Sequence, residues 1–265
     1  GLLRPDSAAA PGLAEARQVA DELATMPDCA PAVARVALVF DYESAWAWTI
    51  QPQGRDFDYF RLVFDTYRAL RRLGLSVDIL PPDCADLSAY KLVLAPGLMR
   101  LRDNLRAALA RFNGLALFGP RAGAKTADMA IPASLPPDIP GITQRISRVE
   151  SLRPGATRAL PEGAFLRWFE HLDGAGSVHL ATQGGAPALV GEGNMRYLAG
   201  WPDAVAFRAI LGELCVQAGL ETHDLPEGVR LRDTASHRFF FNYTSAPVQV
   251  LGQSLPPAGV HWQPL

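Results

Sequence analysis

The chain has 265 residues, of which 49% are hydrophobic and 20% are charged, proportions typical of a soluble globular protein. Its formal net charge of -2 supplies no positive field for nucleic acid, and it lacks the run of about eighteen apolar residues that a bilayer-spanning helix needs. Composition therefore predicts one large or two smaller domains, with neither nucleic acid nor a membrane as a partner.

The cysteine pattern bears on the redox compartment. Cys29, Cys84 and Cys215 are widely spaced and odd in number, which favours reduced thiols over a disulfide framework, and none belongs to a Cys-x-x-Cys pair. The chain begins at Gly1 without a basic region followed by an apolar one, so no signal peptide is expected. These features predict a cytoplasmic protein.

The first expected element is an amphipathic helix over residues 13–25. Its apolar side chains share one helical face, but only proline, alanine and a few polar residues precede it. We therefore expect a helix without a partner of its own, followed by a linker over residues 27–31.

Residues 35–80 have the pattern of a strand, a helix and a second strand. The continuous apolar run over residues 36–40 predicts a strand buried on both faces, and residues 77–80 predict the next strand. Residues 41–55 are expected to form a loop, although such a connection needs only roughly two to six residues. That loop carries Tyr42, Glu43, Trp46, Trp48, Gln51 and Gln53.

The alternation of strands and helices continues to residue 118. Asp56 is a suitable N-cap for a helix that stops at Gly74. The stripe expected to face the sheet consists of Phe60, Val63, Phe64, Tyr67, Leu70 and Leu73. Further strands are expected at residues 91–95 and 115–118, with a helix over residues 101–112 between them. This order predicts an α/β fold with a doubly wound, mostly parallel sheet and right-handed crossovers.

Beyond Pro120 the pattern changes twice. The sequence IPASLPPDIPGI predicts an excursion over the surface, because repeated proline forbids a long helix. Short strands and a closing helix are then expected at residues 178–182, 188–190, 196–199 and 204–218. A small antiparallel β domain is expected from strand-like runs at residues 228–232, 237–243 and 248–251.

Residues 119–126, GPRAGAKT, nearly match the phosphate loop G-x-x-x-x-G-K-[ST]. That motif needs a glycine directly before its lysine so that backbone amides can wrap the phosphates, and this chain has Ala124 there. Pro132 also prevents a full helix from following Thr126. The sequence therefore favours a Gly-rich turn with a solvated Lys125 over a nucleotide site.

No constellation of catalytic or metal-binding residues is recognisable. Asp41, Glu43, Asp56 and Asp58 could be read as a glycosidase pair, but such a pair is defined by a spacing that sequence cannot show. No Ser-His-Asp or Cys-His arrangement and no metal-ligand spacing is convincing. We therefore assign no catalytic residue, no metal site and no cofactor.

Two indoles in the expected loop are candidates for contact with another molecule. Trp46 and Trp48 would lie at the carboxyl end of a strand, where open α/β sheets bind ligands. Such aromatic side chains anchor protein interfaces, stack on sugar faces or pack into a core. The interface role is favoured, and the other two stay open.

Several segments carry a family resemblance, in order along the chain. The stretch VFDYESAWAWTIQPQGRDFDYFRLVFDTYRALRRLGL resembles the start of the trimerisation domain of glycoside hydrolase family 42 β-galactosidases. GPRAGAKTADMAIP, SRVESLRPG, RYLAGWPD and LPEGVRLR with FFFNYT resemble later parts of the same family. GLLRPDSAAAPGLAEARQVADEL resembles the segment that leaves its catalytic barrel, so the likeness covers nearly the whole chain.

The resemblance implies a three-part enzyme. Residues 1–33 would be the exit segment and helix that follow a missing catalytic barrel, residues 34–220 the α/β trimerisation domain, and residues 221–265 a small C-terminal β domain. A (β/α)₈ barrel takes about 250 residues, so the barrel and its two catalytic glutamates would lie outside this chain.

The resemblance also implies that the α/β domain is similar to class I glutamine amidotransferases. Those enzymes use a cysteine on a turn after one strand and a histidine after a late strand. Here the turn PRAGAK contains no cysteine, and Trp201 stands where the histidine would be. Without a thiolate or an imidazole, amidotransfer has no chemical route.

Taken as a family member, the chain is expected to be the non-catalytic scaffold of a β-galactosidase. The full-length protein would be a homotrimer, assembled through the α/β domain, that hydrolyses terminal β-D-galactosides with retention. Its partners would be the catalytic barrel of the same or a neighbouring subunit and a galactoside. Residues near the substrate or the interface would be Tyr42, Glu43, Trp46, Trp48 and Gln51. A stand-alone amidotransferase-like domain that binds a small ligand is the alternative, and an NTP-binding protein is the third hypothesis.

Overall fold

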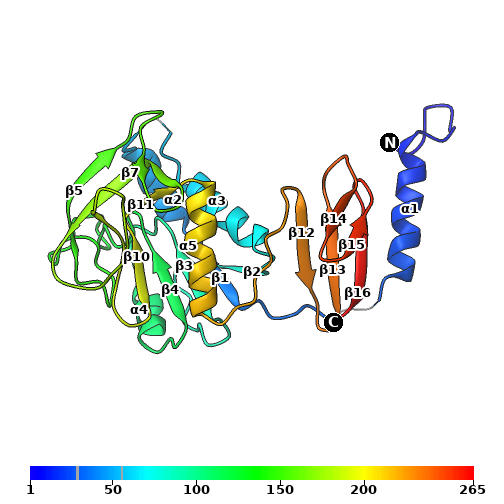
Figure 1. The fold of residues 1–265 in the computed structure, drawn as a ribbon. Coiled ribbons are helices and arrows are strands. Elements are labelled where there is room, and N and C mark those ends of the chain that lie inside the picture. The colour runs from blue at the N-terminus through cyan, green and yellow to red at the C-terminus, as the bar shows by residue number, and fades with distance from the viewer. Residues whose placement is uncertain (28–29, 55) are drawn as a thin grey trace.

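The computed structural model describes residues 1–27, 30–54 and 56–265, and its largest element is a seven-stranded sheet (Figure 1). The strands of this sheet are β1 (Val36–Val39), β2 (Val77–Leu80), β3 (Leu92–Ala95), β4 (Leu115–Phe118), β8 (Val178–Ala181), β9 (Pro187–Val190) and β10 (Met195–Leu198). Their order is β2-β1-β3-β4-β10-β9-β8, parallel from β2 to β10 and antiparallel in the last two pairs. The predicted α/β fold with a mostly parallel sheet is confirmed.

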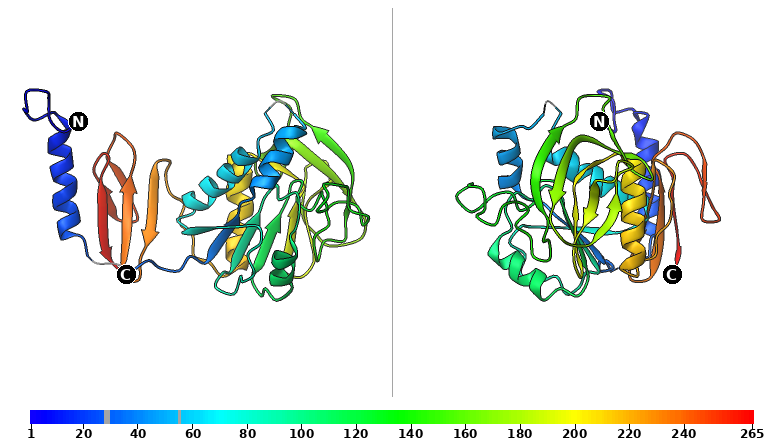
Figure 2. Two further views of the ribbon diagram at one scale, coloured as in Figure 1. Left: turned by 180° about the vertical axis from the view of Figure 1, so that it is seen from behind. Right: turned by 60° about the vertical axis from the view of Figure 1, so that its left-hand side comes forward.

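Helices cover both faces of the parallel strands. Helix α3 (Tyr59–Arg72) packs beside α5 (Ala204–Gln217) on one face. The crossover from β3 to β4 runs in the opposite direction to that from β1 to β2, so its helix α4 (Asp103–Ala110) lies on the other face (Figure 2). Strands β1, β3 and β4 are buried throughout, which explains their continuous apolar sequences. The edge strand β2 is partly exposed and carries Asp78, and the buried β10 carries Arg196.

Helix α3 differs from its prediction at its start and in its orientation. Its N-cap is Asp58, whose carboxylate accepts a hydrogen bond from the backbone N–H of Arg61 at 3.2 Å, so the prediction of Asp56 is wrong. The buried residues of α3 are Tyr59, Leu62, Val63, Thr66 and Leu70. Phe60 and Phe64, expected to face the sheet, are instead 63% and 46% exposed, because the buried set follows the helical period from Tyr59.

The prediction of a loop over residues 41–55 is wrong for most of that range, because helix α2 (Tyr42–Ile50) follows β1 directly. Asp41 is 3% exposed and caps this helix. Its carboxylate accepts hydrogen bonds from the backbone N–H groups of Glu43 at 3.3 Å and Ser44 at 2.9 Å, and from the Ser44 hydroxyl at 2.6 Å. Arg55, at the end of the predicted loop, lies outside the described residues.

Residues 131–142, predicted as a surface excursion, contain no helix or strand, and most of a second, antiparallel sheet that the sequence did not predict follows them. Its strands are β5 (Arg145–Ser151), β6 (Arg158–Ala159), β7 (Ala164–Asp173) and β11 (Gly200–Pro202). Phe57, which precedes α3, contacts Trp168 of β7 and Trp201 of β11 with ring centroids 4.8 and 5.7 Å apart. The second sheet therefore joins the same core as the parallel sheet.

The C-terminal residues form a β module with a core of its own. Its strands are β12 (Val229–Asp233), β13 (His237–Asn242), β14 (Val248–Val250), β15 (Gln253–Leu255) and β16 (Val260–Pro264). They make a three-stranded antiparallel sheet, β12-β13-β16, and the hairpin β14-β15. The core of the module contains Leu225, Val229, Leu231, Phe240, Val250 and Leu255. The three strand-like runs predicted here are confirmed as β12, β13 and β14.

The first predicted helix is confirmed as α1 (Gly12–Thr25), and none of its residues is buried. Figure 1 shows it beside β16, at the end of the molecule far from the parallel sheet. Helix α1 therefore presents an apolar face that the described part of the chain leaves uncovered, with Leu23 60% exposed.

The buried cap of α2 should contribute more to stability than the exposed cap of α3. We expect Asp41→Ala to cost about 2 kcal/mol, because it removes a cap with several hydrogen bonds, and Asp58→Ala about 1 kcal/mol or less. Urea unfolding followed by circular dichroism measures both variants. Equal losses would contradict a special role for Asp41.

Candidate functional site

The order of the parallel strands places the topological switch point between β1 and β3. From β1 the chain passes to β2 on one side and then to β3 and β4 on the other, so the direction of winding reverses there. Open α/β sheets bind ligands in the crevice at the carboxyl ends of such strands. Helix α2 begins at the end of β1 and occupies this position in the chain.

The Trp48 indole, on α2, fills the switch point. Its Nε1–H donates a hydrogen bond to the carbonyl oxygen of Gly97, two residues after β3, at 3.2 Å. A Cβ on Gly97 would lie 2.9 Å from the Trp48 ring and 3.0 Å from the Tyr59 ring, which explains a glycine there. Phe57 stacks on Trp48 with ring centroids 4.5 Å apart and planes at 7°. The crevice that would receive a ligand is thus closed by the chain's own side chains.

The sequence-predicted site residues separate into a buried and an exposed set. Trp48 is 1% exposed, so of the three roles left open for the indoles it packs into the core. Tyr42 and Trp46 are 68% and 62% exposed. Glu43 is half-exposed and pairs with Arg102 at 3.2 Å, and Gln51 is exposed at the end of α2. Four of the five residues therefore lie together on the outer side of α2.

The exposed side chains of α2 continue onto α3 and form one apolar surface. We call this surface the aromatic stripe, defined as Tyr42, Trp46, Ile50, Phe60 and Phe64. The half-buried ring of Phe40 links its two parts, with centroids 4.9 Å from Tyr42 and 6.4 Å from Phe60. A contiguous exposed patch of large apolar side chains is the mark of an interaction surface.

Behind Trp48 lies a buried polar cluster that the sequence analysis did not identify. Glu170, on β7, accepts hydrogen bonds from the Arg121 backbone N–H and the Trp168 indole at 3.0 Å each, and from the Tyr197 hydroxyl at 2.7 Å. Burial raises the pKa of Glu170 to about 7, although these bonds and the Arg121 charge act in the opposite direction. Burial beside Glu170 likewise raises the pKa of Tyr197. The available sequence signal was the G-x-R-x-G turn at residues 119–123.

The near match to a phosphate loop has its backbone amides engaged within the chain. The N–H groups of Gly123 and Lys125 donate to the carbonyl oxygens of Leu98 and Met99, both at 2.9 Å, and that of Thr126 donates to Ala130 at 2.9 Å. Amides bonded in this way are not available to wrap phosphates. The geometry supports the Gly-rich turn that the sequence favoured.

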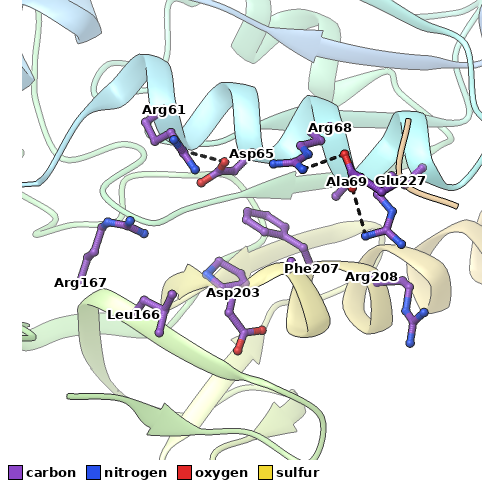
Figure 3. A pocket seen from close by; sticks show the side chains of 13 residues that line it. Arg61, Asp65, Arg68, Ala69, Leu166, Arg167, Asp203, Phe207, Arg208 and Glu227 are labelled. Carbon is purple, nitrogen blue, oxygen red and sulfur yellow. Dashed lines mark hydrogen bonds and ion pairs between the residues drawn. The ribbon is translucent and has the colours of Figure 1, made fainter. Parts of the chain in front are cut away.

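A cleft of about 230 Å³ lies between α3, α5 and the segment that precedes β12 (Figure 3). Five arginines line it, and all are paired with carboxylates. The pairs are Arg61–Asp65 at 2.9 Å, Arg68–Glu227 at 2.7 Å, Arg72–Glu227 at 3.6 Å, Arg167–Asp56 at 3.0 Å and Arg208–Asp224 at 3.1 Å. Because its positive charges are compensated internally, the cleft is a junction between α3, α5 and the C-terminal module, not an open anion site.

Metal, membrane and thiol chemistry concern residues 1–27, 30–54 and 56–265. No group of three or more His, Cys, Asp or Glu residues there could hold a metal ion. No helix in these ranges is long and apolar enough to cross a membrane. Cys84 and Cys215 are free thiols, and Cys29 lies outside the described residues.

Comparison with known proteins identifies relatives along nearly the whole chain. The family described as "Beta-galactosidase trimerisation domain" matches residues 34–221. A β-galactosidase of Thermus thermophilus is 43% identical over 94% of this chain, which spans 39% of that relative's length. The crystal structure of a β-galactosidase from the psychrophilic Marinomonas ef1 is 34% identical with a TM-score of 0.90, covering 99% of this chain and 44% of that one. The structure of the β-galactosidase from the Antarctic haloarchaeon Halorubrum lacusprofundi is 30% identical with a TM-score of 0.89, covering 99% of this chain and 44% of that one.

The pKa of Glu170 predicts a pH dependence of stability. The folded chain keeps a proton on Glu170 up to about pH 7, whereas the unfolded chain releases it near 4.5, so stability should fall as pH rises between these values. Glu170→Gln keeps the acceptor but cannot ionise, so its melting temperature should exceed that of the parent increasingly from about pH 5 to 7. The exposed Glu162→Gln is the matched control and should follow the parent. Thermal melts of the three proteins at several pH values test this prediction. If the melting temperatures of Glu170→Gln and the parent change in parallel with pH, the raised pKa of Glu170 is contradicted.

Proposed function

Because the chain belongs to the β-galactosidase trimerisation domain family, we propose that it assembles three copies of its protein into a homotrimer through the aromatic stripe. The observation that carries this proposal is the exposure of five large apolar side chains on one continuous surface of a domain in this family. Complete burial of such a side chain contributes about 1.5–3 kcal/mol, so the stripe supplies on the order of 10 kcal/mol before the costs of association. A closed ring of three uses heterologous contacts, so the stripe meets a different surface of the next copy.

The whole protein, in this proposal, hydrolyses terminal β-D-galactosides with retention, and its two catalytic glutamates lie outside this chain. Support comes from relatives named β-galactosidases, of whose length this chain spans about two fifths. The catalytic barrel of the same or a neighbouring subunit is then a partner of the chain, and a galactoside is the substrate. Trp46, with Tyr42, Glu43 and Gln51, lies on the side of α2 that faces a neighbour and borders its sugar site.

The proposal divides the chain as the family resemblance implied. Residues 1–33 connect the barrel, residues 34–220 form the trimerisation domain and residues 221–265 form a C-terminal β domain. The division is supported by two separate hydrophobic cores and by the absence of buried residues in α1. A cytoplasmic location is retained in the proposal, supported by the free thiols of Cys84 and Cys215.

The parallel sheet is, in the same proposal, an amidotransferase-like scaffold without amidotransferase chemistry. Its support is the positive φ of Arg121 on the turn after β4, where such enzymes hold a cysteine, and the indole of Trp201 in place of a histidine. The alternative, a stand-alone domain that binds a small ligand, is disfavoured because Trp48 fills the switch point. The scaffold is therefore used for assembly.

Replacing Trp46 by glutamate tests assembly. A charge in the middle of a buried apolar contact is costly, so Trp46→Glu should shift the protein from trimer to monomer at micromolar concentration without a large change in melting temperature. Sedimentation equilibrium measures the mass. Tyr243→Glu is the matched control, since Tyr243 is 71% exposed on the C-terminal module, outside the stripe. A monomeric parent or a trimeric Trp46→Glu variant would refute the proposal.

The sugar-site role of Trp46 needs the whole protein. There, Trp46→Phe, which retains an aromatic side chain, should raise the KM for a chromogenic galactoside more than it lowers kcat, because the residue binds the sugar without taking part in bond cleavage. Unchanged KM in a trimeric variant would assign Trp46 to assembly alone.

A further inference from the structure

Arg121 occupies the centre of a tight turn, Gly119 to Gly123, that follows the buried strand β4. Its φ is 62°, in the left-handed region that residues other than glycine seldom adopt. The chain passes so close to its neighbours that a Cβ on Gly119 would lie 2.2 Å from the carbonyl oxygen of Leu198. Hydrolases use a strained turn with this glycine spacing to raise a nucleophile above a sheet. In this chain the raised side chain is a guanidinium group.

The guanidinium group of Arg121 is surrounded by aromatic rings. Its Cζ lies 4.8 Å from the ring centroid of Trp48, 5.6 Å from that of Phe57 and 5.7 Å from that of Trp168, all within the roughly 6 Å of a cation–π contact. The residue is 7% exposed, and its Nη1 has no hydrogen-bond partner among the described residues. Burial lowers the pKa of Arg121 to about 10, which leaves the group charged at neutral pH.

A second buried arginine, Arg196, has surroundings that differ from the aromatic rings around Arg121. Arg196 is 8% exposed, but its Nη1 donates to the carbonyl oxygens of Gly193 and Met195 at 2.8 and 2.9 Å. Peptide carbonyls therefore satisfy Nη1 of Arg196, whereas Nη1 of Arg121 has no such partner among the described residues. For Arg121 the corresponding compensation comes from aromatic faces, and the Glu170 side chain accepts a hydrogen bond from its backbone N–H.

We propose that Trp48, Phe57 and Trp168 form a guanidinium-binding cage, which the chain fills with its own Arg121, and that this occupant holds α2 in the orientation that presents the aromatic stripe. The second part rests on the proposed role of the stripe in assembly. Its physical link is the Trp48 indole, which has Phe57 on it at 4.5 Å and Arg121 over its ring at 4.8 Å. Removing the cation leaves Trp48 without this contact and frees α2 to shift.

Chemical rescue of Arg121→Gly in the complete chain tests the cage. Glycine is chosen because it accepts the positive φ without strain, so the variant loses the side chain alone. We expect a lower melting temperature than the parent, and guanidinium chloride at about 20 mM should restore roughly half the loss by mass action. Equal concentrations of NaCl and of urea, a neutral planar analogue, should restore little, because the cage selects a planar cation.

Two further variants keep the test decisive. Arg196→Ala is the matched control: it also removes a buried arginine, but one without the cage, so guanidinium should not rescue it. If urea, NaCl or the control gives the same rescue, the cage is refuted. Should Arg121→Gly fail to fold, Arg121→Lys should melt above Arg121→Met, because lysine keeps a cation over the rings. A methionine variant as stable as the parent would also refute the proposal.

The oligomeric mass of the parent and of Arg121→Gly tests the claim about the cage separately from the claim about assembly. In a trimeric parent, Arg121→Gly should dissociate at micromolar concentration and reassociate with about 20 mM guanidinium. A variant that remains trimeric without guanidinium would refute the link to α2. A monomeric parent would instead refute the proposed function, while the rescue of melting temperature would still decide on the cage.

Discussion

The contact of the Trp48 indole with Phe57 and Arg121 sets the arrangement of the carboxyl end of the parallel sheet. Helix α2 has nine residues, too few for stability on its own, so it depends on tertiary contacts. Stacking of an aromatic pair contributes about 0.5–1.5 kcal/mol beyond burial, and a desolvated cation–π contact about 2 kcal/mol. Together with the hydrogen bond to Gly97, these contacts fix α2 across the ends of β1 and β3.

The same contact determines what kind of function the fold can carry. A sheet of this topology offers a ligand crevice at its switch point, and here an indole occupies it. Once the interior site is closed, the exposed side chains on the outside of α2 and α3 remain available to meet another molecule. The molecule therefore illustrates why function must be argued from a site and not from the architecture that supports it.

The sequence predicted the parallel strands well, because burial on both faces leaves a continuous apolar run such as Val36–Val39 with glycine or proline nearby. It did not predict α2, because Trp46 and Ile50 face solvent while Ser44 and Ala47 face inward, which gives no amphipathic pattern of the usual kind. The sequence placed Phe60 and Phe64 inside for a related reason. An apolar side chain suits a position removed from water, and sequence alone does not tell a core from a contact with another chain.

The strands β5 and β7 were missed because charged residues such as Arg148 and Glu170 interrupt their apolar pattern, and only tertiary pairing makes them strands. In the Arg121 cage, Trp48 lies 73 positions before Arg121 and Trp168 lies 47 positions after it, so no local pattern reveals the cage.

The junction in Figure 3 has a mechanical consequence for the C-terminal module. Glu227 is 55% exposed and Arg68 45%, so their ion pair is weak and is screened by salt. Directional bonds supplement it, such as those from Arg71 to the carbonyl oxygen of Leu231 and from the Leu225 N–H to that of Arg72. Salt should therefore weaken this junction only in part, because the bonds to the carbonyl oxygens remain when the ion pairs are screened.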